Sequence, residues 1–322
     1  MIIVTPKYYK NFKCIAGDCP DSCCQGWEVD ADEKSLEYYK TLPDSLEIKQ
    51  RINSVLDKDE FDNVIFRLAP KKRCPFLNEE NLCDMHIAIG GEHTPVTCRN
   101  FPRFIYDFGG TREIGISFSC PVAAELIYNS DESLAFDSEI NSDLPTINDI
   151  DAELFIKLKQ ARTRAFEIIQ NAEKPLNKRL CELLDFAKEL QKEVEDYEEG
   201  GEEIGFEEVL KNPELINPEY RERVDNFRVK RIDNSLANEN IAAYFIYKYF
   251  LLAVYDKDVL SKAKMAAVGV LINTYLGEGE WTMHLWSKET EHSQYNMDRY
   301  KRLLKEANCL STNNLKNSIN CE

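Results

Sequence analysis

Eight of the 11 cysteines in this 322-residue chain lie before residue 121, and no other feature limits its fold and chemistry as much. Four of them fall in the pattern Cys14-x4-Cys19-x3-Cys23-Cys24. The other four are Cys74, Cys83, Cys98 and Cys120. This clustering predicts that the first third of the chain is organised around thiol chemistry. The remaining cysteines, which are scattered and are expected to bind no metal, are Cys181, Cys309 and Cys321.

Three roles for these thiols compete. Disulfides need an oxidising compartment, and the first residues resemble no secretory signal, so we expect a cytoplasmic protein with reduced cysteines. Zinc needs four tetrahedral thiolate or imidazole ligands. The short pairs Cys19-x3-Cys23 and Cys83-x2-His86 could supply them, which makes His86 the candidate imidazole ligand. His93 is expected in a surface loop.

An iron–sulfur centre is the third role, and the cysteines that precede proline favour it. Its thiolates come from loops and are often followed by proline. Proline disfavours helix at the preceding residue, which helps keep a sulfur in a loop. Eight thiols exceed the four ligands of one centre, so either two centres form or some cysteines are structural. The Cys-Pro pairs are Cys19-Pro20, Cys74-Pro75 and Cys120-Pro121.

Two arginines lie within five residues after one of these cysteines. Arg99 and Arg103 come after Cys98. Their guanidinium groups could compensate thiolate charge or bind a carboxylate through two hydrogen bonds. Ordinary surface ion pairs are the alternative for both.

The periodicity predicts an α+β protein. Residues 1–128 read as a cysteine-rich metal domain with short strands and a β-hairpin around Gly109-Gly110, and residues 129–150 as a polar linker. Residues 151–322 read as a helical domain. The segments expected to be regular are a helix over 31–56 broken at Pro43, a strand over 61–68, hairpin strands over 104–108 and 114–118, and helices over 153–170, 176–194, 240–255, 261–276 and 281–307.

Charge and hydropathy exclude several classes of partner. A net charge of −17 disfavours binding to nucleic acid or to an anionic membrane surface. The longest apolar stretch, Ile241–Tyr255, is too short to span a bilayer and contains Lys248. We interpret its aromatic residues 244–250 as the buried centre of a helical bundle rather than a binding surface. The acidic run 182–208 is expected to be a solvated loop at its centre.

A series of motifs resembles the flagellin lysine-N-methylase family, whose first part is similar to the zinc- or iron-chelating cysteine-cluster domains. The motifs cover roughly residues 8–125, and Glu239-Asn240 before an aromatic helix adds a weaker similarity. They are Phe12-x-Cys14, Cys19-x3-Cys23-Cys24-x-Gly26-Trp27, Cys74-Pro75-Phe76-Leu77, Cys83-x2-His86, Cys98-Arg99-x-Phe101-Pro102-Arg103 and Ser119-Cys120-Pro121.

This resemblance implies a cytoplasmic enzyme that transfers a methyl group from S-adenosylmethionine to lysine ε-amino groups of flagellin, its protein partner. It also implies an iron–sulfur cluster, of the 4Fe-4S type, with zinc as the alternative metal. The ligands would be a subset of the eight clustered cysteines. The chain has neither the glycine-rich loop of Rossmann-type methyltransferases nor the C-x3-C-x2-C run of radical enzymes, so the donor site must be unconventional or absent.

The base that takes the proton from lysine stays open at this stage. Tyr106, Asp107 and Glu113 are candidates because they lie on the predicted hairpin, while Arg99 and Arg103 are candidates as cations near the metal. Two further classes of function compete with the enzyme. One is a non-catalytic zinc- or iron-binding cysteine-cluster protein, and the other is an electron-transfer or redox-sensing protein.

Overall fold

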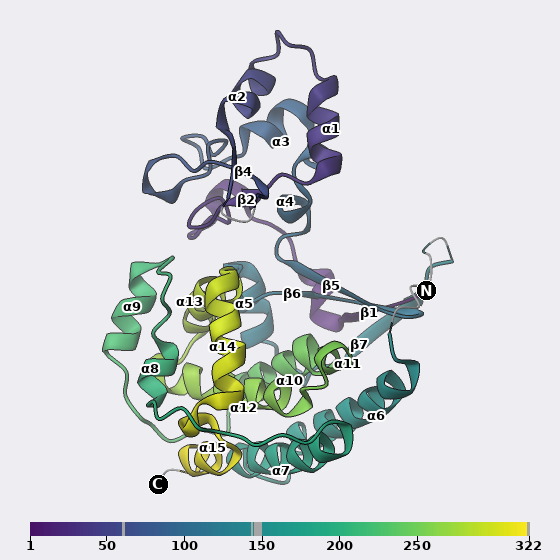
Figure 1. The fold of residues 1–322 in the computed structure, drawn as a ribbon, viewed down its shortest axis with the longest axis vertical. Coiled ribbons are helices and arrows are strands. Elements are labelled where there is room, and N and C mark those ends of the chain that lie inside the picture. The colour runs from purple at the N-terminus through teal and green to yellow at the C-terminus, as the bar shows by residue number, and fades with distance from the viewer. Residues whose placement is uncertain (60–61, 143, 145–149, 321–322) are drawn as a thin grey trace. The chain divides into compact units, whose positions relative to one another are not determined.

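The computed structural model describes residues 1–59, 62–142, 144 and 150–320 (Figure 1). The chain forms two compact units. The cysteine-rich unit consists of Lys13–Phe104 and Cys120–Val122. The helical unit consists of Met1–Phe12, Ile105–Ser119 and the chain from Ala123 onward. The cysteine-rich unit is therefore inserted into the sequence of the helical unit.

The predicted α+β class is confirmed, while the units divide the chain differently from the predicted domains. The predicted domain 1–128 contains β1 (Ile2–Pro6) and β6 (Thr111–Ile116), two strands that belong with the helical unit. The predicted linker 129–150 contains strand β7 (Phe136–Ile140), which pairs with β1 over five residues. Positions 143 and 145–149 of that linker lie outside the described residues.

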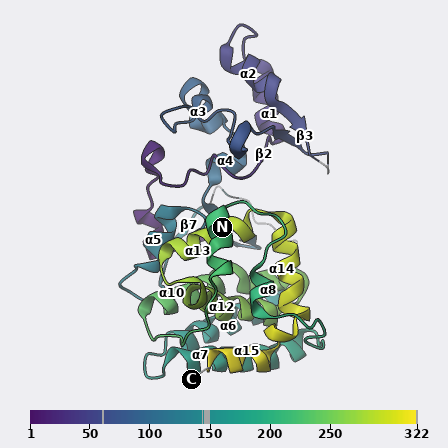
Figure 2. The same cartoon turned by 90° about the vertical axis from the view of Figure 1, so that its left-hand side faces the viewer.

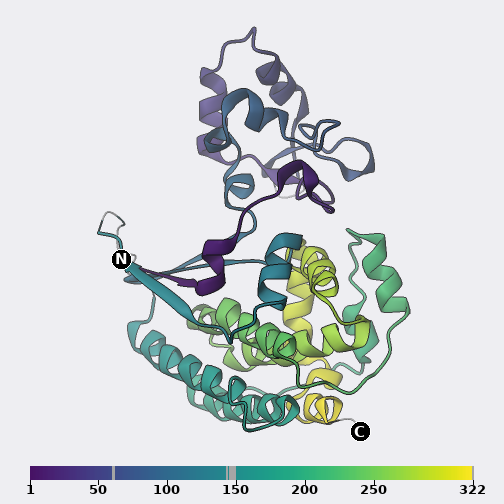
Figure 3. The same cartoon turned by 180° about the vertical axis from the view of Figure 1, so that it is seen from behind.

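A four-stranded sheet of order β5-β6-β1-β7 opens the helical unit. Strand β1 pairs in parallel with β6, with Ile2 opposite Thr111, and antiparallel with β7 (Figure 3). The predicted hairpin is confirmed as β5 and β6, with Gly109 at φ 57° in the turn, a conformation that glycine adopts without strain. The other strands of this sheet are β1 (Ile2–Pro6), β5 (Arg103–Phe108) and β6 (Thr111–Ile116).

Helices make up the rest of this unit. The short 3-10 helices are η1 (Lys7–Asn11), η5 (Phe250–Leu252) and η6 (Asn308–Leu310). The α-helices are α5 (Pro121–Tyr128), α6 (Ala152–Ile169), α7 (Leu176–Val194), α8 (Phe206–Leu210), α9 (Pro218–Asp225), α10 (Leu236–Tyr249), α11 (Ala253–Asp256), α12 (Val259–Leu276), α13 (Glu280–Glu291), α14 (Gln294–Glu306) and α15 (Thr312–Ile319).

Helices α10 and α12 form the centre of the bundle. Every residue of α12 is buried, and α10 is buried from Asn238 to Tyr249, so the aromatic stretch is a core element as predicted. Helices α6 and α7 pack on one side of this pair, and α15 lies against α7 (Figures 1 and 2). The single helix predicted over 281–307 is two helices, because Ser293 caps a new one by accepting a hydrogen bond from the Asn296 N–H at 3.1 Å.

The central helix pair depends on one glycine. A methyl group at Gly269 of α12 would lie far inside van der Waals contact with the Phe245 ring of α10. We expect Gly269→Ala to lower the free energy of unfolding by about 1–3 kcal/mol, because a packed core must shift to admit it. Urea denaturation measures the change. Gly110→Ala, where the added methyl group meets nothing within 4 Å, is the matched control; equal effects of both variants would contradict the prediction.

The cysteine-rich unit has a small three-stranded sheet of order β2-β4-β3. Its apolar core includes Tyr39, Ile52, Phe66 and Phe76. The predicted break at Pro43 is confirmed by the end of α1 and the start of α2, and the predicted strand 61–68 is β4, with Phe61 outside the described residues. Its elements are β2 (Val29–Asp30), β3 (Leu56–Lys58), β4 (Val64–Phe66), α1 (Glu33–Thr41), α2 (Glu47–Val55), α3 (Asp84–Ile89), α4 (Val96–Asn100), η2 (Ala16–Asp18), η3 (Pro70–Lys72) and η4 (Gly91–His93).

Candidate functional site

Three thiols of the cysteine-rich unit, those of Cys23, Cys24 and Cys74, lie close enough to shift one another's pKa, with Cys24 in the middle. The interaction lowers the pKa of Cys24 and raises the pKa of Cys23 and Cys74. The backbone brings these segments together, since the Cys74 N–H donates to the Cys24 carbonyl oxygen at 2.8 Å. An antiparallel bridge between Gln25 and Arg73 holds the same pairing. Two motifs far apart in sequence thus meet at Cys24.

Three further thiols lie within electrostatic range of Cys23, Cys24 and Cys74. Burial and the charge of Cys24 raise the pKa of Cys98 to about 12. Burial also raises the pKa of Cys83, and Cys24 adds to that effect. The charge of Cys14 likewise raises the pKa of Cys23. We call these six residues the thiol group: Cys14, Cys23, Cys24, Cys74, Cys83 and Cys98.

Backbone amides point at two sulfurs of the thiol group. The Sγ of Cys83 accepts from the His86 N–H at 3.5 Å and thereby caps α3. The Sγ of Cys14 accepts from the Ala16 N–H at 3.4 Å. Hydrogen bonds to sulfur stabilise thiolates and tune metal centres, so these amides suit ligand cysteines.

The remaining cysteines are placed differently. Cys19 donates to the carbonyl oxygen of Asp21 at 3.3 Å, and Cys120 is buried in the cysteine-rich unit. Cys181 and Cys309 belong to the helical unit, where Cys181 accepts from the side-chain amide of Asn320. Cys321 lies outside the described residues.

The donor chemistry of the thiol group fits a thiophilic metal. Three sulfurs lie close enough to shift one another's pKa, and thiolates are the ligands that iron–sulfur clusters and structural zinc use. Within the described part of the chain, no three Cys, His, Asp or Glu side chains are already spaced around a common point that could hold an ion.

The predicted histidine and arginine candidates lie in the same unit. The side chain of His86 is exposed beside Gly91, and the His93 ring stacks on Tyr38 with centroids 3.7 Å apart. The Arg99 guanidinium donates to the carbonyl oxygen of Thr94 and to that of Glu92 at 3.3 Å. Its charge opposes the upward shift of the Cys98 pKa.

The side-chain hydrogen bonds of Arg99 hold the loop at Glu92 and Thr94 beside the thiol group. Arg103, the other arginine candidate, is the first residue of β5.

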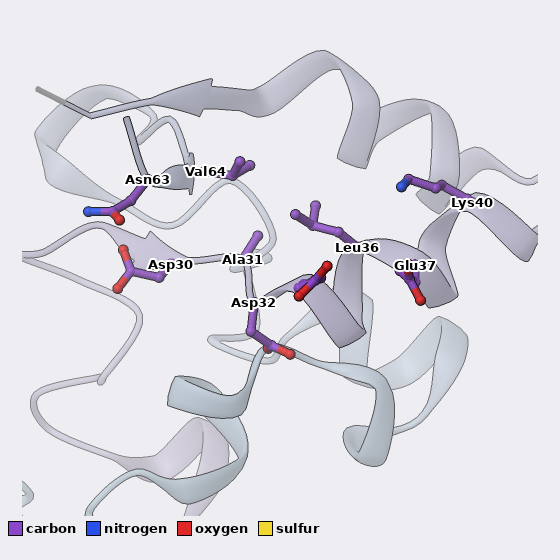
Figure 4. A pocket seen from close by; sticks show the side chains of 9 residues that line it. Asp30, Ala31, Asp32, Leu36, Glu37, Lys40, Asn63 and Val64 are labelled. Atoms are coloured by element: carbon purple, nitrogen blue, oxygen red, sulfur yellow. The ribbon is translucent and has the colours of Figure 1, made fainter. Parts of the chain in front are cut away.

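An acidic pocket of about 340 Å³ opens between the start of α1 and strand β4 (Figure 4). Burial raises the pKa of the Asp30 carboxyl, and the nearby charge of Asp59 adds to this. Lys40 is the one cation among the residues that line the pocket. Its acidic lining residues are Asp30, Asp32, Glu33 and Glu37.

The helical unit contains a second group of functional side chains, which we call the Lys248–Glu291 cluster. The Lys248 Nζ of α10 lies 2.7 Å from Glu291 Oε1 at the end of α13 and 3.1 Å from the Tyr244 hydroxyl. It also lies 3.3 Å from Ser117 Oγ. The charged side chains are only 7% and 5% exposed, so this is a buried ion pair.

More groups converge on the carboxylate of this pair. The hydroxyls of Tyr249 and Ser287 donate to Glu291, and Ser117 Oγ donates to its second oxygen at 3.2 Å. Burial raises the pKa of Tyr106, and the charge of Glu291 raises it further. The predicted candidate Tyr106 therefore belongs to the surroundings of this cluster. Lys248 in an apolar helix was the one sequence signal for it, because a buried ammonium requires a partner.

The two acidic candidates on the hairpin are engaged elsewhere. Arg112 forms two hydrogen bonds with Asp107, at 2.6 and 2.7 Å. Arg162 of α6 forms two with Glu113 of β6, at 2.7 and 2.5 Å, in a nearly fully buried pair. Both carboxylates are thus in ion pairs with arginines that have a structural role.

A histidine beside the cluster makes stability depend on pH. Burial lowers the pKa of His292 from 6.5 to about 4, against the opposing charge of Glu291. Between these pH values the unfolded chain binds a proton there that the folded chain does not. The free energy of unfolding should therefore rise between pH 4 and pH 6.5, by at most about 1.4 kcal/mol per pH unit. Acidification over the same range removes this contribution of His292.

Urea denaturation of the parent and of His292→Gln at about pH 5 and about pH 7 measures this contribution. The variant should show the smaller difference between the two pH values. Identical differences would mean that His292 does not titrate within this range.

Sequence comparisons show which known proteins this chain is similar to. No family model matches the chain, and no solved structure matches it. The flagellar biosynthetic protein FliU of Salmonella muenchen is 26% identical over 136 residues, which are 41% of this chain and 80% of that protein. The lysine-N-methylases of Salmonella choleraesuis and Salmonella typhimurium are also 26% identical over 136 residues. This chain is similar to the lysine-N-methylases.

The similarity confirms the resemblance that the cysteine motifs indicate. The matched region makes up 34% of each lysine-N-methylase and 41% of this chain, so most of each protein lies outside it. Among the residues that the structure describes, no helix is both long and apolar enough to cross a membrane.

Proposed function

We propose that this chain is a cytoplasmic protein-lysine N-methyltransferase that acts on flagellin. The methyl donor is S-adenosylmethionine, and the thiol group holds an iron–sulfur cluster. The observation that carries the proposal is that backbone pairing brings Cys74 to Cys23 and Cys24, in a protein similar to lysine-N-methylases. The name of a second relative, a flagellar biosynthetic protein, supports flagellin as the substrate.

The thiol group narrows the choice of metal ligands. Cys23, Cys24 and Cys74 would supply three thiolates, and Cys83 or Cys98 the fourth, because both lie within electrostatic range of Cys24. An iron–sulfur cluster bound there would supply a one-electron redox centre, with its potential set by charge and by hydrogen bonds to sulfur. Zinc, the alternative metal, would give a colourless and closed tetrahedral site.

The chemistry of the acceptor agrees with the charge of the protein. A lysine ε-amino group attacks only when it is deprotonated, so it must be desolvated and placed in line with the donor. The acidic pocket at Asp30, Asp32 and Glu37 has the charge that attracts a lysine side chain toward the cysteine-rich unit. This attraction supports a basic region of flagellin as the segment recognised.

One purification tests the proposal. The full chain, isolated without oxygen, is analysed for iron, sulfide and zinc and is then incubated with S-adenosylmethionine and flagellin. We expect iron and sulfide, visible absorption that bleaches on reduction, and methylated lysines detected by mass spectrometry. A chain that binds zinc tightly and methylates no flagellin would instead be a non-catalytic cysteine-cluster protein.

A further inference from the structure

Cys24 and Cys74 face each other across a short antiparallel pairing of two chain segments. Gln25 and Arg73 form an antiparallel bridge. The Cys74 N–H donates to the Cys24 carbonyl oxygen at 2.8 Å, next to that bridge. Because antiparallel segments run in opposite directions, the residue before Gln25 lies opposite the residue after Arg73. The pairing therefore sets two cysteines from distant parts of the sequence directly opposite each other.

The spacing of such a pair suits a disulfide. Residues that lie opposite each other in an antiparallel pair have Cα atoms about 4.5–5.5 Å apart and side chains on the same face. A disulfide joins cysteines whose Cα atoms are about 4.4–6.8 Å apart. The thiols of Cys24 and Cys74 also lie close enough to shift each other's pKa. The two sulfurs can therefore be joined with little movement of the backbone.

Backbone hydrogen bonds hold the Cys74 segment in this position from both sides. Before it, Ala69 and Arg73 exchange two hydrogen bonds, at 2.8 and 3.3 Å, which close the turn at η3. After it, the Leu77 N–H donates to the Cys74 carbonyl oxygen at 3.1 Å. All of these bonds are between main-chain atoms, so they hold Cys74 opposite Cys24 without help from a metal.

The third close thiol, that of Cys23, is a poorer partner for either residue. The Cα atoms of adjacent residues are about 3.8 Å apart. This spacing is below the range of about 4.4–6.8 Å for disulfides, so a bond between Cys23 and Cys24 would be strained. In the register of the pairing, the residue opposite Cys23 is Pro75 and not Cys74. The geometry therefore favours one of the three possible bonds.

Both sulfurs are within reach of a small oxidant. Cys24 and Cys74 are partly exposed, whereas Cys120 and Cys181 are buried. Oxidation of cysteine is selective for accessible thiols. The disulfides that do form in reducing compartments are mostly transient and redox-sensing ones. A bond between Cys24 and Cys74 would belong to this class.

We infer that Cys24 and Cys74 form a reversible disulfide that switches the thiol group between an open, metal-binding state and a closed state. The oxidant is hydrogen peroxide, and the reductant is a cellular dithiol. In the closed state two sulfurs of the thiol group are no longer available as thiolates, which are the form that binds metal. This inference goes beyond the proposed function, because it concerns when the thiol group takes up metal and not which reaction follows.

The chemistry of the switch takes two steps. One sulfur attacks a peroxide oxygen, the O–O bond breaks, and a sulfenic acid and one water are formed. The second sulfur then attacks the sulfenic sulfur, the S–O bond breaks, and the S–S bond and a second water are formed. Together the two thiols lose two electrons and two protons, which reduce the peroxide. A dithiol reverses the bond by exchange and becomes a disulfide itself.

Mass spectrometry of the full chain, used as purified, tests the inference. The chain is treated with hydrogen peroxide, its remaining thiols are alkylated, and it is digested without reductant. We expect the peptides of Cys24 and Cys74 to be joined, and dithiothreitol to separate them. Titration with zinc should show that the oxidised chain has lost more affinity than the about 10–100-fold caused by loss of an outer-shell partner. Reduction should restore it.

Two single variants complete the test. Cys74→Ser should give no joined peptide, and circular dichroism verifies that it is folded. Cys309→Ser is the matched control, because it removes a partly exposed thiol of the helical unit, and it should leave the joined peptide unchanged. Peroxide-treated parent chain in which both thiols still react with the alkylating reagent would overturn the inference. Joined peptides that pair Cys23 in place of Cys24 or Cys74, or a disulfide-linked chain that binds zinc as tightly as the reduced one, would also overturn it.

Discussion

A Cys24→Ala chain should retain almost no bound metal and no measurable methyl transfer to flagellin. Cys24 is the shared partner of Cys23 and Cys74, so its loss removes the central thiolate of the group. Metal binding and local folding are coupled in such sites, and the remaining thiols would not hold a cluster. Iron and sulfide analysis after anaerobic purification, followed by mass spectrometry of flagellin lysines, measures both effects.

The control for this variant is a chain with Cys181→Ser and Cys309→Ser, which changes two thiols of the helical unit. It should keep its full metal content and activity. Circular dichroism must show that Cys24→Ala is folded, so that the loss reports on the site. If a folded and metal-free Cys24→Ala chain methylates lysine at the parent rate, methyl transfer does not depend on the metal.

The second large effect is on stability. Arg162→Met should lower the free energy of unfolding by about 3–5 kcal/mol, because it leaves the Glu113 carboxylate buried and uncompensated. Their side chains are 9% and 3% exposed and connect α6 to β6. Urea denaturation measures the change.

Two further variants show whether charge is the cause. Arg162→Met combined with Glu113→Leu removes both charges and should recover most of the loss. Arg164→Met breaks an exposed pair with Glu167 on the same helix and should cost less than about 1 kcal/mol. A double variant as unstable as Arg162→Met would mean that packing, and not charge, determines the loss.

The sequence predicts the elements whose residues carry their own periodic signal. Helices α6 and α7 and the β5–β6 hairpin lie where the apolar pattern places them. Strand β7 is absent from the prediction because Phe136–Ile140 lies in a polar segment, and it is a strand only because β1 pairs with it. The boundaries of the units follow from such long-range pairing, which a local pattern does not contain.

The same reasoning separates the two candidate sites. Cysteine spacing predicts a thiol cluster, but the pairing of Cys24 with Cys74 depends on a backbone bridge between distant segments. The Lys248–Glu291 cluster joins two residues that are 43 positions apart. It also includes Ser117, which follows β6 in the same unit. Nothing in the sequence near Glu291 indicates a partner, so only the folded chain identifies it.

The insertion of the cysteine-rich unit has a consequence for the order of events during synthesis. Ribosomes add about 5–20 residues per second, and units fold as they emerge. Residues Lys13–Phe104 are complete while α6 to α15 are still unmade. If the proposed function is correct, the thiols could therefore acquire metal before the helical bundle exists. Strand β1 emerges earlier, but it can pair only after β6 and β7 have been synthesised. In a nascent chain that lacks metal, the thiols would therefore stay without a bound metal while the helical bundle is translated.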